Sequence, residues 1–247
     1  MLKVVLPEAK AFASVVEALS KVVDEASLRF TPEKVVLKAL DPAKVSMFIM
    51  EFPSTLFEEY DVSEEVKIGF NTAVLLKLLK RSKKGDKLEI SLEEGLAKFS
   101  IIGAYSKLYK ILNIETTEEE LPEPRLELNV NAIILSDPLK HAIKDAETVG
   151  DIVEFLAETE DELIIKGKGE KAEAETRISR ETGALISLEV KEPSRSTYAI
   201  EHIKNVVALT KVADTVEVSF STKMPLKLAF TILGEGKVVY FLAPKVE

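Results

Sequence analysis

The chain has 247 residues, of which 46% are hydrophobic and 30% charged, and it carries a formal net charge of −9. It is long enough for two domains of ordinary size, and the absence of cysteine excludes disulfides, thiolate metal sites and cysteine nucleophiles. No apolar run reaches the roughly 18 residues that cross a bilayer and no signal peptide is visible. We therefore expect a cytoplasmic protein, or a nuclear one if the cell has a nucleus. The lack of glutamine beside abundant lysine and glutamate is typical of thermophiles, although biased genome composition gives the same pattern.

The first half is predicted to contain two short helices among strands. Asn71 is the predicted N-cap of the second helix. Alternating or apolar runs bounded by turns, one of them Thr31-Pro32-Glu33, predict strands at residues 28–38, 44–52, 87–92, 97–102 and 105–112. The apolar residues at helical spacing are Phe12, Val15, Val16, Leu19, Val22 and Val23 in the first helix, and Val74, Leu75, Leu78 and Leu79 in the second.

The second half follows the same plan. Ser136 is the predicted cap of a helix whose apolar positions include Leu139, Ile143, Ala146 and Val149, and another helix is predicted near residues 200–211. Gly167-Lys168-Gly169, at strand spacing, is interpreted as a hairpin turn and not as a phosphate-binding loop. Strands are predicted at residues 152–157, 162–167, 172–179, 184–190, 215–221, 226–232 and 237–242.

One offset of 128 positions relates the two halves. Residues 31–38 (TPEKVVLK) correspond to 159–166 (TEDELIIK), and the same offset carries Asp86 to Asp214. Such a duplication presents one surface twice, which is typical of a chain built for geometry. Residues 115–128 (ETTEEELPEPRLEL) are acidic and have no regular period, as expected of a linker. We therefore predict an α+β fold of two similar antiparallel-sheet domains with short helices, residues 1–114 and 129–247, joined by the connector 115–128.

We find no catalytic motif. His141 and His202 are the only histidines, and both lie on predicted helices without a partner at metal-ligand spacing, so we interpret them as exposed helix-face residues. The carboxylates resemble solvated strand faces, and none can be paired for acid–base work from sequence alone. We expect no catalytic residue, no metal and no cofactor.

Bases are concentrated on the predicted helices although the chain is acidic. Residues 70–85 hold five bases and no acid, and four of the bases share one side of the helix and its exit. Lysine suits contact with phosphates without sequence readout, whereas a solvated face is the alternative for any single helix. The residues expected to contact nucleic-acid phosphates are Lys10, Lys21, Lys77, Lys80, Arg81, Lys83, Lys84, Lys140, Lys144, Lys204 and Lys211.

Four motifs give the chain a family resemblance. LDPAKVSM at residues 40–47, LPEP at 121–124, MPLKLAF at 224–230 and LAPKVE at 242–247 resemble, in order and spacing, the sliding clamps of the proliferating cell nuclear antigen (PCNA) family in their archaeal form. The resemblance covers essentially the whole chain. It implies a ring of three subunits around duplex DNA that catalyses nothing and tethers DNA polymerase, flap endonuclease and DNA ligase after a clamp loader opens it. A ring of identical chains and a ring of different clamp chains both stay open.

The resemblance also implies a site for partner peptides under the linker, in which an apolar anchor and extended backbone suit strand addition. Ordinary core packing is the alternative for each apolar residue. The matching positions are Leu40, Lys44, Val45, Met47, Leu121, Pro122, Met224, Pro225, Phe241, Leu242, Ala243 and Pro244.

Subunit contacts in the family pair one edge strand from each half, which here implies residues 105–112 and 171–179. Lys107 and Lys110 would then face Glu173 and Glu175. The residues assigned to this interface are Tyr105, Lys107, Tyr109, Lys110, Glu173, Glu175 and Arg177. One departure concerns DNA: Glu201 and Ala208 stand where some members have bases, so contact there is expected to be weaker.

Two other functions compete with the clamp. A checkpoint-type clamp, or a clamp-like scaffold for repair and signalling proteins, would keep the fold and use other partners. A nuclease that used the acidic linker and the lysine cluster would need carboxylates converging on a metal.

Overall fold

The computed structural model describes residues 2–116 and 122–245. The chain divides into two compact units. Unit 1 comprises Met1–Pro42, Phe48–Leu121 and Ile232–Val238, and unit 2 comprises Ala43–Met47, Pro122–Thr231 and Val239–Glu247. The domain limits 1–114, 115–128 and 129–247 stay a prediction.

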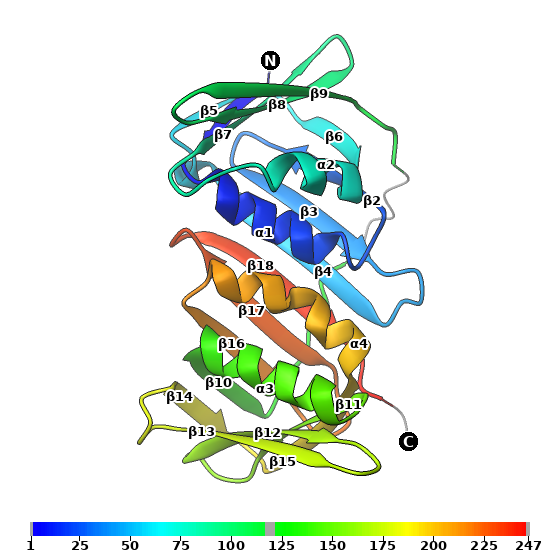
Figure 1. The fold of residues 1–247 in the computed structure, drawn as a ribbon, viewed down its shortest axis with the longest axis vertical. Helices are drawn as coiled ribbons and strands as arrows, with labels where there is room; N and C mark the ends of the chain where they lie inside the picture. The colour runs from blue at the N-terminus through cyan, green and yellow to red at the C-terminus, as the bar shows by residue number, and fades with distance from the viewer. Residues whose placement is uncertain (1, 117–121, 246–247) are drawn as a thin grey trace. The chain divides into compact units, whose positions relative to one another are not determined.

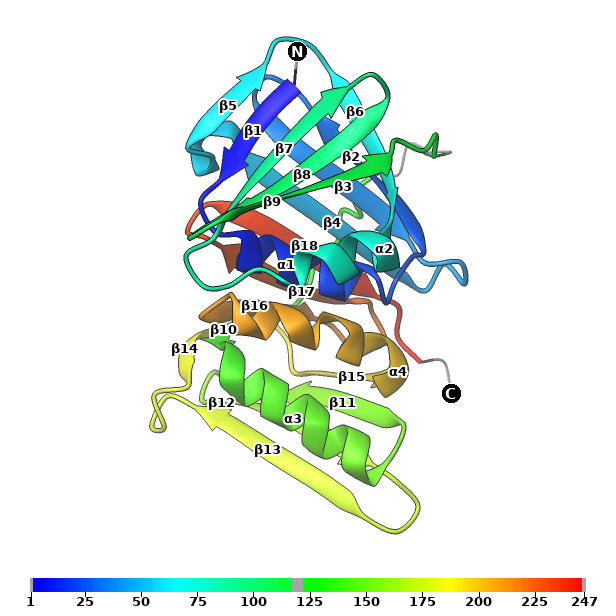
Figure 2. The ribbon, with the colours of Figure 1, turned by 45° about the horizontal axis from the view of Figure 1, so that its top comes forward.

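Unit 1 contains two groups of strands and two α-helices, α1 (Ala9–Leu19) and α2 (Thr72–Leu79) (Figure 1). A short 3-10 helix, η1 (Ser54–Leu56), follows β4. The first group is an antiparallel sheet in the order β5-β1-β7-β8-β9, seen face-on in Figure 2. Its strands are β1 (Leu2–Leu6), β5 (Glu59–Val62), β7 (Lys87–Glu93), β8 (Leu96–Ile102) and β9 (Ser106–Leu112). The second group has the order β4-β3-β2-β6, with β2 (Glu25–Phe30), β3 (Lys34–Leu40), β4 (Ser46–Pro53) and β6 (Val66–Asn71).

Unit 2 repeats this arrangement. The order β14-β10-β16-β17 corresponds to β5-β1-β7-β8, and the antiparallel sheet β13-β12-β11-β15 corresponds to β4-β3-β2-β6. Its helices are α3 (Ser136–Val149), α4 (Ile200–Ile203) and the 3-10 segment η2 (Lys204–Lys211). Its strands are β10 (Val130–Leu135), β11 (Ile152–Ala157), β12 (Glu162–Lys168), β13 (Glu173–Ser179), β14 (Leu185–Val190), β15 (Ser194–Ala199) and β17 (Leu226–Ile232), with β16 (Thr215–Phe220) and β18 (Gly236–Leu242).

The predicted duplication is confirmed in the limits of the strands. β3 and β12 both begin and end 128 residues apart, as do β6 and β15. The turns before β3 and β12 contain the same hydrogen bond. Thr31 Oγ1 accepts from the amide of Glu33, and Thr159 Oγ1 accepts from the amide of Asp161. The α+β fold with mainly antiparallel strands is likewise as predicted.

The helix starts repeat as well. The amide of Ala9 donates to the carbonyl of Asp86 in unit 1, and the amide of Ser136 donates to that of Asp214 in unit 2. The second helix of each unit starts in the same way, because Thr72 donates to Asp24 and Ile200 donates to Asp151. An aspartate carbonyl therefore takes one of the orphan amides at each of these helix starts.

The helices α1 and α3 each pack against their unit through a face of mainly apolar buried residues. Nine residues of α1 are buried, and Phe12 meets the ring of Phe52 edge-on, with 6.5 Å between the ring centroids. Leu139, Ile143 and Ala146 of α3 are also buried. The helical spacing of apolar residues in the sequence thus predicted the faces that these two helices bury.

The predicted N-cap at Asn71 is confirmed, because its Oδ1 accepts a hydrogen bond from the amide of Val74 at 3.0 Å. Three other predictions about the helices need correction. Ser136 is not a cap: it is the first helical residue of α3, and its buried Oγ has no partner among the described residues. Val74 is 50% exposed and not core, whereas Thr72, Leu75 and Leu79 of this short helix are buried. The helix predicted near residues 200–211 is one α-turn followed by 3-10 structure.

Gly167 is not in a turn. It is a residue of β12, and a Cβ added there would lie 2.4 Å from the Cα of Ala146 on α3. Glycine at this position therefore permits close packing of helix on strand. The turn itself begins at Gly169, whose amide donates to the carbonyl of Ala172.

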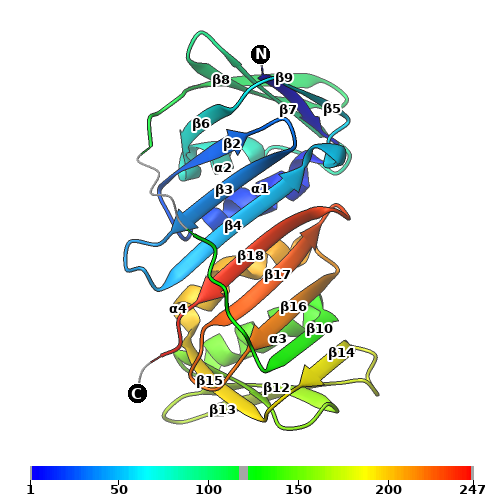
Figure 3. The ribbon, with the colours of Figure 1, turned by 180° about the vertical axis from the view of Figure 1, so that it is seen from behind.

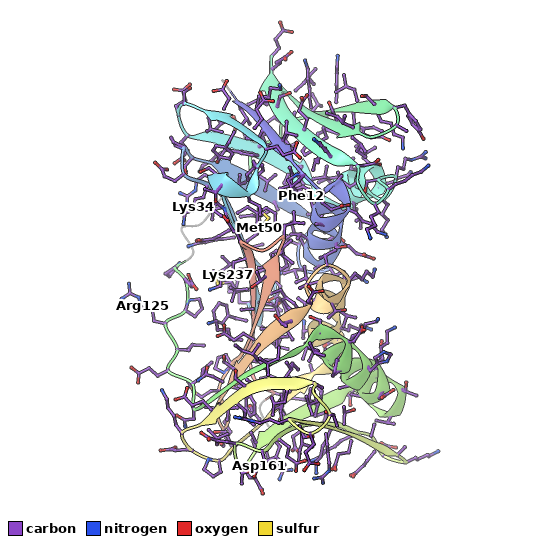
Figure 4. The ribbon with its side chains drawn as sticks, turned by 90° about the vertical axis from the view of Figure 1, so that its left-hand side faces the viewer. Phe12, Lys34, Met50, Arg125, Asp161 and Lys237 are labelled. Carbon is purple, nitrogen blue, oxygen red and sulfur yellow. The ribbon has the colours of Figure 1, made fainter. Side chains whose placement is uncertain are left out.

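The connector is described at residues 115–116 and from Pro122 onward. Residues 122–128 contain neither helix nor strand, and Leu128 is buried. Figure 4 shows the side chain of Arg125 directed away from the ribbon. Of the predicted partner-binding residues, Leu121 lies outside the described residues, and Pro122 is exposed.

Candidate functional site

Each unit carries a pair of helices in mutual contact, α1 with α2 in unit 1 and α3 with α4 and η2 in unit 2. An ion pair links the helices of each pair. Lys80 Nζ lies 3.7 Å from the carboxylate of Glu17 in unit 1, and Lys204 Nζ lies 2.9 Å from that of Glu147 in unit 2. Since these side chains reach solvent, the pairs stabilise little, but each lowers the positive charge that its lysine presents.

The bases predicted to face DNA lie on these helices or in the segments that directly follow them. All are exposed except Lys140, which is half-buried and pairs with Asp137 at 3.2 Å. Within the described residues, the side chains of Lys77, Lys83 and Lys84 make no ion pair or hydrogen bond. The positive charge of residues 77–84 is therefore the least neutralised part of the helical surface.

The helices of unit 2 are less positive. Asp145 and Glu147 stand among the lysines of α3, and Glu201 is exposed on α4. Ala208 is buried, so this position adds no charge to the surface. The two units carry the same helix pair with different charge.

The C-terminal residues of the described chain lie beside two other segments of unit 2. The amide of Ala243 donates to the carbonyl of Val45 at 2.8 Å, and the amide of Lys245 donates to the carbonyl of Thr197 on β15 at the same distance. Figure 3 shows this segment leaving β18 and passing beside α4. The C-terminal backbone is therefore held in place by main-chain hydrogen bonds.

A cavity of about 290 Å³ opens beside this segment. Four residues predicted to bind partner peptides line it: Val45, Leu242, Ala243 and Pro244. Asp151, Ala199, Glu201, His202 and Lys245 complete the lining. The structure thus brings the 43–47 loop and the chain end together, although they are about 200 residues apart in sequence.

The other predicted partner-binding residues lie elsewhere. Met47 and Phe241 are buried, and Lys44 is exposed with a positive φ of 58°. Met224 and Pro225 are half-buried, and the carbonyl of Met224 accepts hydrogen bonds from Tyr198 and Ser196. Leu40, also half-buried, belongs to unit 1.

The two strands expected at subunit contacts are both edge strands. β9 ends the sheet β5-β1-β7-β8-β9, and β13 ends the sheet β13-β12-β11-β15. Tyr105, Leu108 and Leu112, at or near β9, are 61%, 55% and 74% exposed. An edge strand that leaves such large apolar side chains in water is typical of an interaction surface.

The residues assigned to these edges divide between two faces. Lys107 and Tyr109 lie opposite Ile101 and Phe99 of β8, on the buried side of the sheet, whereas Lys110 lies on the exposed side. Lys107 Nζ donates to the carbonyl of Arg81 and lies 5.1 Å from the centroid of the Tyr105 ring. Lys110 is therefore the better placed of the two lysines to meet a partner.

On β13 the charged residues share one face, away from α3. Ala174 lies opposite Gly167, which contacts α3, so Glu173, Glu175 and Arg177 project from the other side. Hydrogen bonds from Lys166 and then Arg177 lower the pKa of the exposed Glu175, and the hydrogen bond to Glu175 raises the pKa of Arg177. Glu175 is thus ionised at neutral pH.

Sequence reasoning missed several residues of the site. His202 is only 27% exposed at its side chain and lines the cavity, so its interpretation as an exposed residue is wrong, whereas His141 is exposed. Glu154 is 2% exposed in the apolar strand β11 and binds Lys168 and Arg195. An acid inside the apolar run IVEFLA was the available signal of a buried ion pair.

Comparison with known proteins agrees with this geometry. Residues 1–117 match the family model described as proliferating cell nuclear antigen, N-terminal domain, and residues 138–245 match the C-terminal domain of the same protein. A protein of Thermofilum pendens named DNA polymerase sliding clamp is 37% identical over 248 residues, covering all of both chains. DNA polymerase sliding clamp 1 of Aeropyrum pernix is 38% identical over 96% of this chain and 97% of its own.

Solved structures show the same likeness. PCNA of Thermococcus kodakaraensis superposes with a TM-score of 0.93 at 29% identity, over 99% of this chain and all of its own. A chain from the PCNA2–PCNA3 complex of Sulfolobus tokodaii gives the same TM-score at 28% identity, with the same coverage. The fold and the matches define a DNA clamp. The chain belongs to the proliferating cell nuclear antigen family, among relatives named DNA polymerase sliding clamps.

In residues 2–116 and 122–245, no group of three or more histidine or acidic side chains is arranged to hold a metal ion. None of the helices in the same ranges has the length and apolar character needed to cross a membrane.

Proposed function

We propose that this chain is the subunit of a DNA polymerase sliding clamp that encircles duplex DNA and tethers replication and repair enzymes. The observation that carries the proposal is the repeated pair of helices, which presents exposed lysines in a chain of net charge −9. Such a surface suits phosphates, because a lysine point charge contacts them without reading bases. Loose contacts of this kind permit sliding, and closure of the ring provides retention.

Ring closure follows from the edge strands. In the proposed ring, β9 of one subunit pairs with β13 of the next, which satisfies the open edge of both sheets. Lys110 would meet Glu173 and Glu175 on the exposed faces, and Leu108 and Leu112 would leave water. Whether the ring contains one kind of chain or several depends on the other clamp chains of the source organism.

Partner enzymes would dock at the cavity beside the C-terminal segment. The proposed partners are DNA polymerase, flap endonuclease, DNA ligase and the clamp loader, each with a short apolar peptide that the cavity holds. Val45, Leu242 and Pro244 offer apolar contact, and the adjacent chain end offers backbone for strand addition. The clamp itself would catalyse no reaction, need no cofactor and work on DNA in the cytoplasm.

A matched pair of variants tests the DNA-facing surface. Lys77→Ala with Lys84→Ala removes two exposed charges that have no partner in the described residues. Lys191→Ala with Lys237→Ala removes the same charge from exposed positions outside the helices. With polymerase and loader on a primed circular template at physiological salt, the first pair should shorten products several-fold and the second should not. Equal product lengths from both variants would remove residues 77–84 from the DNA surface.

A further inference from the structure

A second cavity of about 550 Å³ lies in unit 2 and is lined mainly by the strands β11, β12 and β15 and the turn before β17. Four cations line it, Lys168, Arg195, Lys223 and Lys245, with one acid, Glu154. A cavity with this excess of positive charge contrasts with the net charge of −9 on the whole chain. The local field therefore favours a negatively charged occupant.

The buried acid organises the cations and does not cancel them. Glu154 Oε2 lies 2.9 Å from Lys168 Nζ and 2.5 Å from Arg195 Nε, and the glutamate is 2% exposed. The negative charge of Glu154 is thus neutralised by these two cations. The Arg195 side chain is 59% exposed, and its terminal nitrogens can bind another acceptor. Lys223 is exposed and makes no ion pair with the described residues.

The two cavities adjoin. Pro244 and Lys245 line both of them, and the backbone bond from Lys245 to Thr197 places this segment along β15. Lys245 has a carboxylate 3.7 Å away, that of Asp151, but this acid is 87% exposed and screened by solvent. A peptide anchored in the smaller, partly apolar cavity can therefore continue over Lys245 into the larger, basic one.

We propose that the basic cavity receives acidic side chains that flank the apolar anchor of a partner protein's docking peptide. This inference rests on the proposed docking function and names the chemistry of the partner. The volume is in the range of cavities that take several side chains. Carboxylates suit the guanidinium and ammonium groups, and they would add specificity and association rate to the binding that the apolar anchor supplies.

The test compares two synthetic peptides. Both carry the docking tail of a flap endonuclease, with three glutamates at each end of its apolar anchor in one and three glutamines in the other. Titration calorimetry at low salt should give roughly tenfold tighter binding of the glutamate peptide to the wild-type protein, as two to three exposed charge pairs allow. Raising the salt concentration should reduce that ratio.

Two double variants test whether the preference for the glutamate peptide arises at the basic cavity. Lys223→Gln with Lys245→Gln removes two cations of the cavity and leaves Glu154 paired with Lys168 and Arg195. The glutamate peptide should bind this variant several-fold more weakly, and the tenfold preference for it over the glutamine peptide should fall to about threefold or less. The control Lys191→Gln with Lys237→Gln changes the same charge at exposed residues outside the cavity and should keep the tenfold ratio.

Other results of these binding measurements would contradict the proposal in distinguishable ways. Equal binding of the two peptides by the wild type would overturn the acidic-flank proposal and leave the docking site standing. A glutamate preference that both double variants keep, or lose together, would place it elsewhere on the protein. Loss of duplex DNA binding in Lys223→Gln with Lys245→Gln, with peptide preference intact, would make the cavity a nucleic-acid surface. If the glutamine peptide did not bind at all, the proposed docking function itself would be wrong.

Discussion

Single side chains set the ends of helices in different ways in this chain. Asn71 caps α2 through a hydrogen bond to the amide of Val74, whereas Ser136 begins α3 with a buried hydroxyl that has no partner among the described residues. A cap satisfies an orphan amide, but a buried unpaired hydroxyl carries a desolvation penalty. Two small polar residues at helix starts, Asn71 and Ser136, are therefore expected to have opposite effects on stability.

This contrast gives a paired prediction. Asn71→Ala should lower the free energy of unfolding by about 1 kcal/mol, because the cap is lost. Ser136→Ala should be neutral or stabilising, because it removes a buried polar atom and adds the best helix former. Urea unfolding followed by circular dichroism measures both. A loss for Ser136→Ala equal to that for Asn71→Ala would mean that the hydroxyl has a partner after all.

Tyr60 adds a pH-dependent contribution. Its hydroxyl donates to the carbonyl of Thr31 at 2.6 Å, and burial, with the nearby charge of Glu33, raises its pKa to about 12. Because the folded pKa lies above the unfolded value of about 10, the stabilisation is complete below pH 10. It is lost as the pH rises from about 10 toward 12, because the unfolded chain ionises first.

Tyr60→Phe tests this contribution. At pH 7 the variant should be less stable by about 1 kcal/mol, since the hydrogen bond is gone. The difference from wild type should shrink as the pH rises above 10, since only the wild type loses stability through this phenol. Denaturation at pH 7, 10 and 11 measures the difference. A gap that stays constant with pH would show that the phenol titrates alike in the folded and unfolded chains.

At the scale of the element, the edge strand β9 has two unlike faces. Lys107 lies on the buried side and is already bonded to the carbonyl of Arg81, whereas Lys110 lies on the exposed side with Leu108 and Leu112. In an edge-to-edge pair, the exposed face of β13 offers Glu173 and Glu175. Charge complementarity across the proposed joint therefore depends on Lys110 more than on Lys107.

The corresponding prediction is that Lys110→Glu weakens subunit assembly more than Lys107→Glu does. Reversal at position 110 would oppose like charges across the joint, which destabilises strand pairs. Light scattering measures the mass of the assembly, with one chain at 27.3 kDa, either alone or mixed with other clamp chains of the source. Assembly that tolerates Lys110→Glu as well as Lys107→Glu would exclude this register of β9 and β13.

Elements with a strong local pattern were predictable from the sequence. The repeated TPEKVVLK and TEDELIIK segments predicted β3 and β12 because alternation and the Thr-led turn are local signals. β5 (EYDV) and β15 (SRSTYA) were missed because short polar strands carry no apolar period, and pairing with their neighbours defines them. β6 (VKIGFN) and β10 (VNAIIL) were not predicted either, although both contain apolar residues. The 3-10 character of η2 was likewise not predictable, because 3-10 and α segments share a sequence pattern.

The candidate sites divide in the same way. The lysines of residues 77–84 were found from composition, because five bases without an acid are visible along the sequence. The basic cavity was not, because Glu154, Lys168 and Arg195 come from three strands that only sheet register brings together. The partner-binding and interface residues came from family resemblance, since motif order and not local physics points to them.

At the scale of the whole molecule, duplication is the central feature. Two units of one plan, each with a helix pair and an edge strand, suit a closed assembly in which equivalent units turn by equal angles. For a chain of net charge −9 we expect weak DNA binding by contact alone, and retention by topology instead of affinity. A protein retained in this way is linked to circular DNA as a closed ring.

The most direct measurement loads the clamp onto nicked circular DNA with its clamp loader and passes the complex through a sizing column at high salt. Contacts with phosphates are weakened under these conditions, so only a linked ring stays with the circle. We predict that the clamp co-elutes with circular DNA and is lost when a single restriction cut makes the DNA linear. Retention on the linear DNA, or loss from the intact circle at the same salt, would contradict the account.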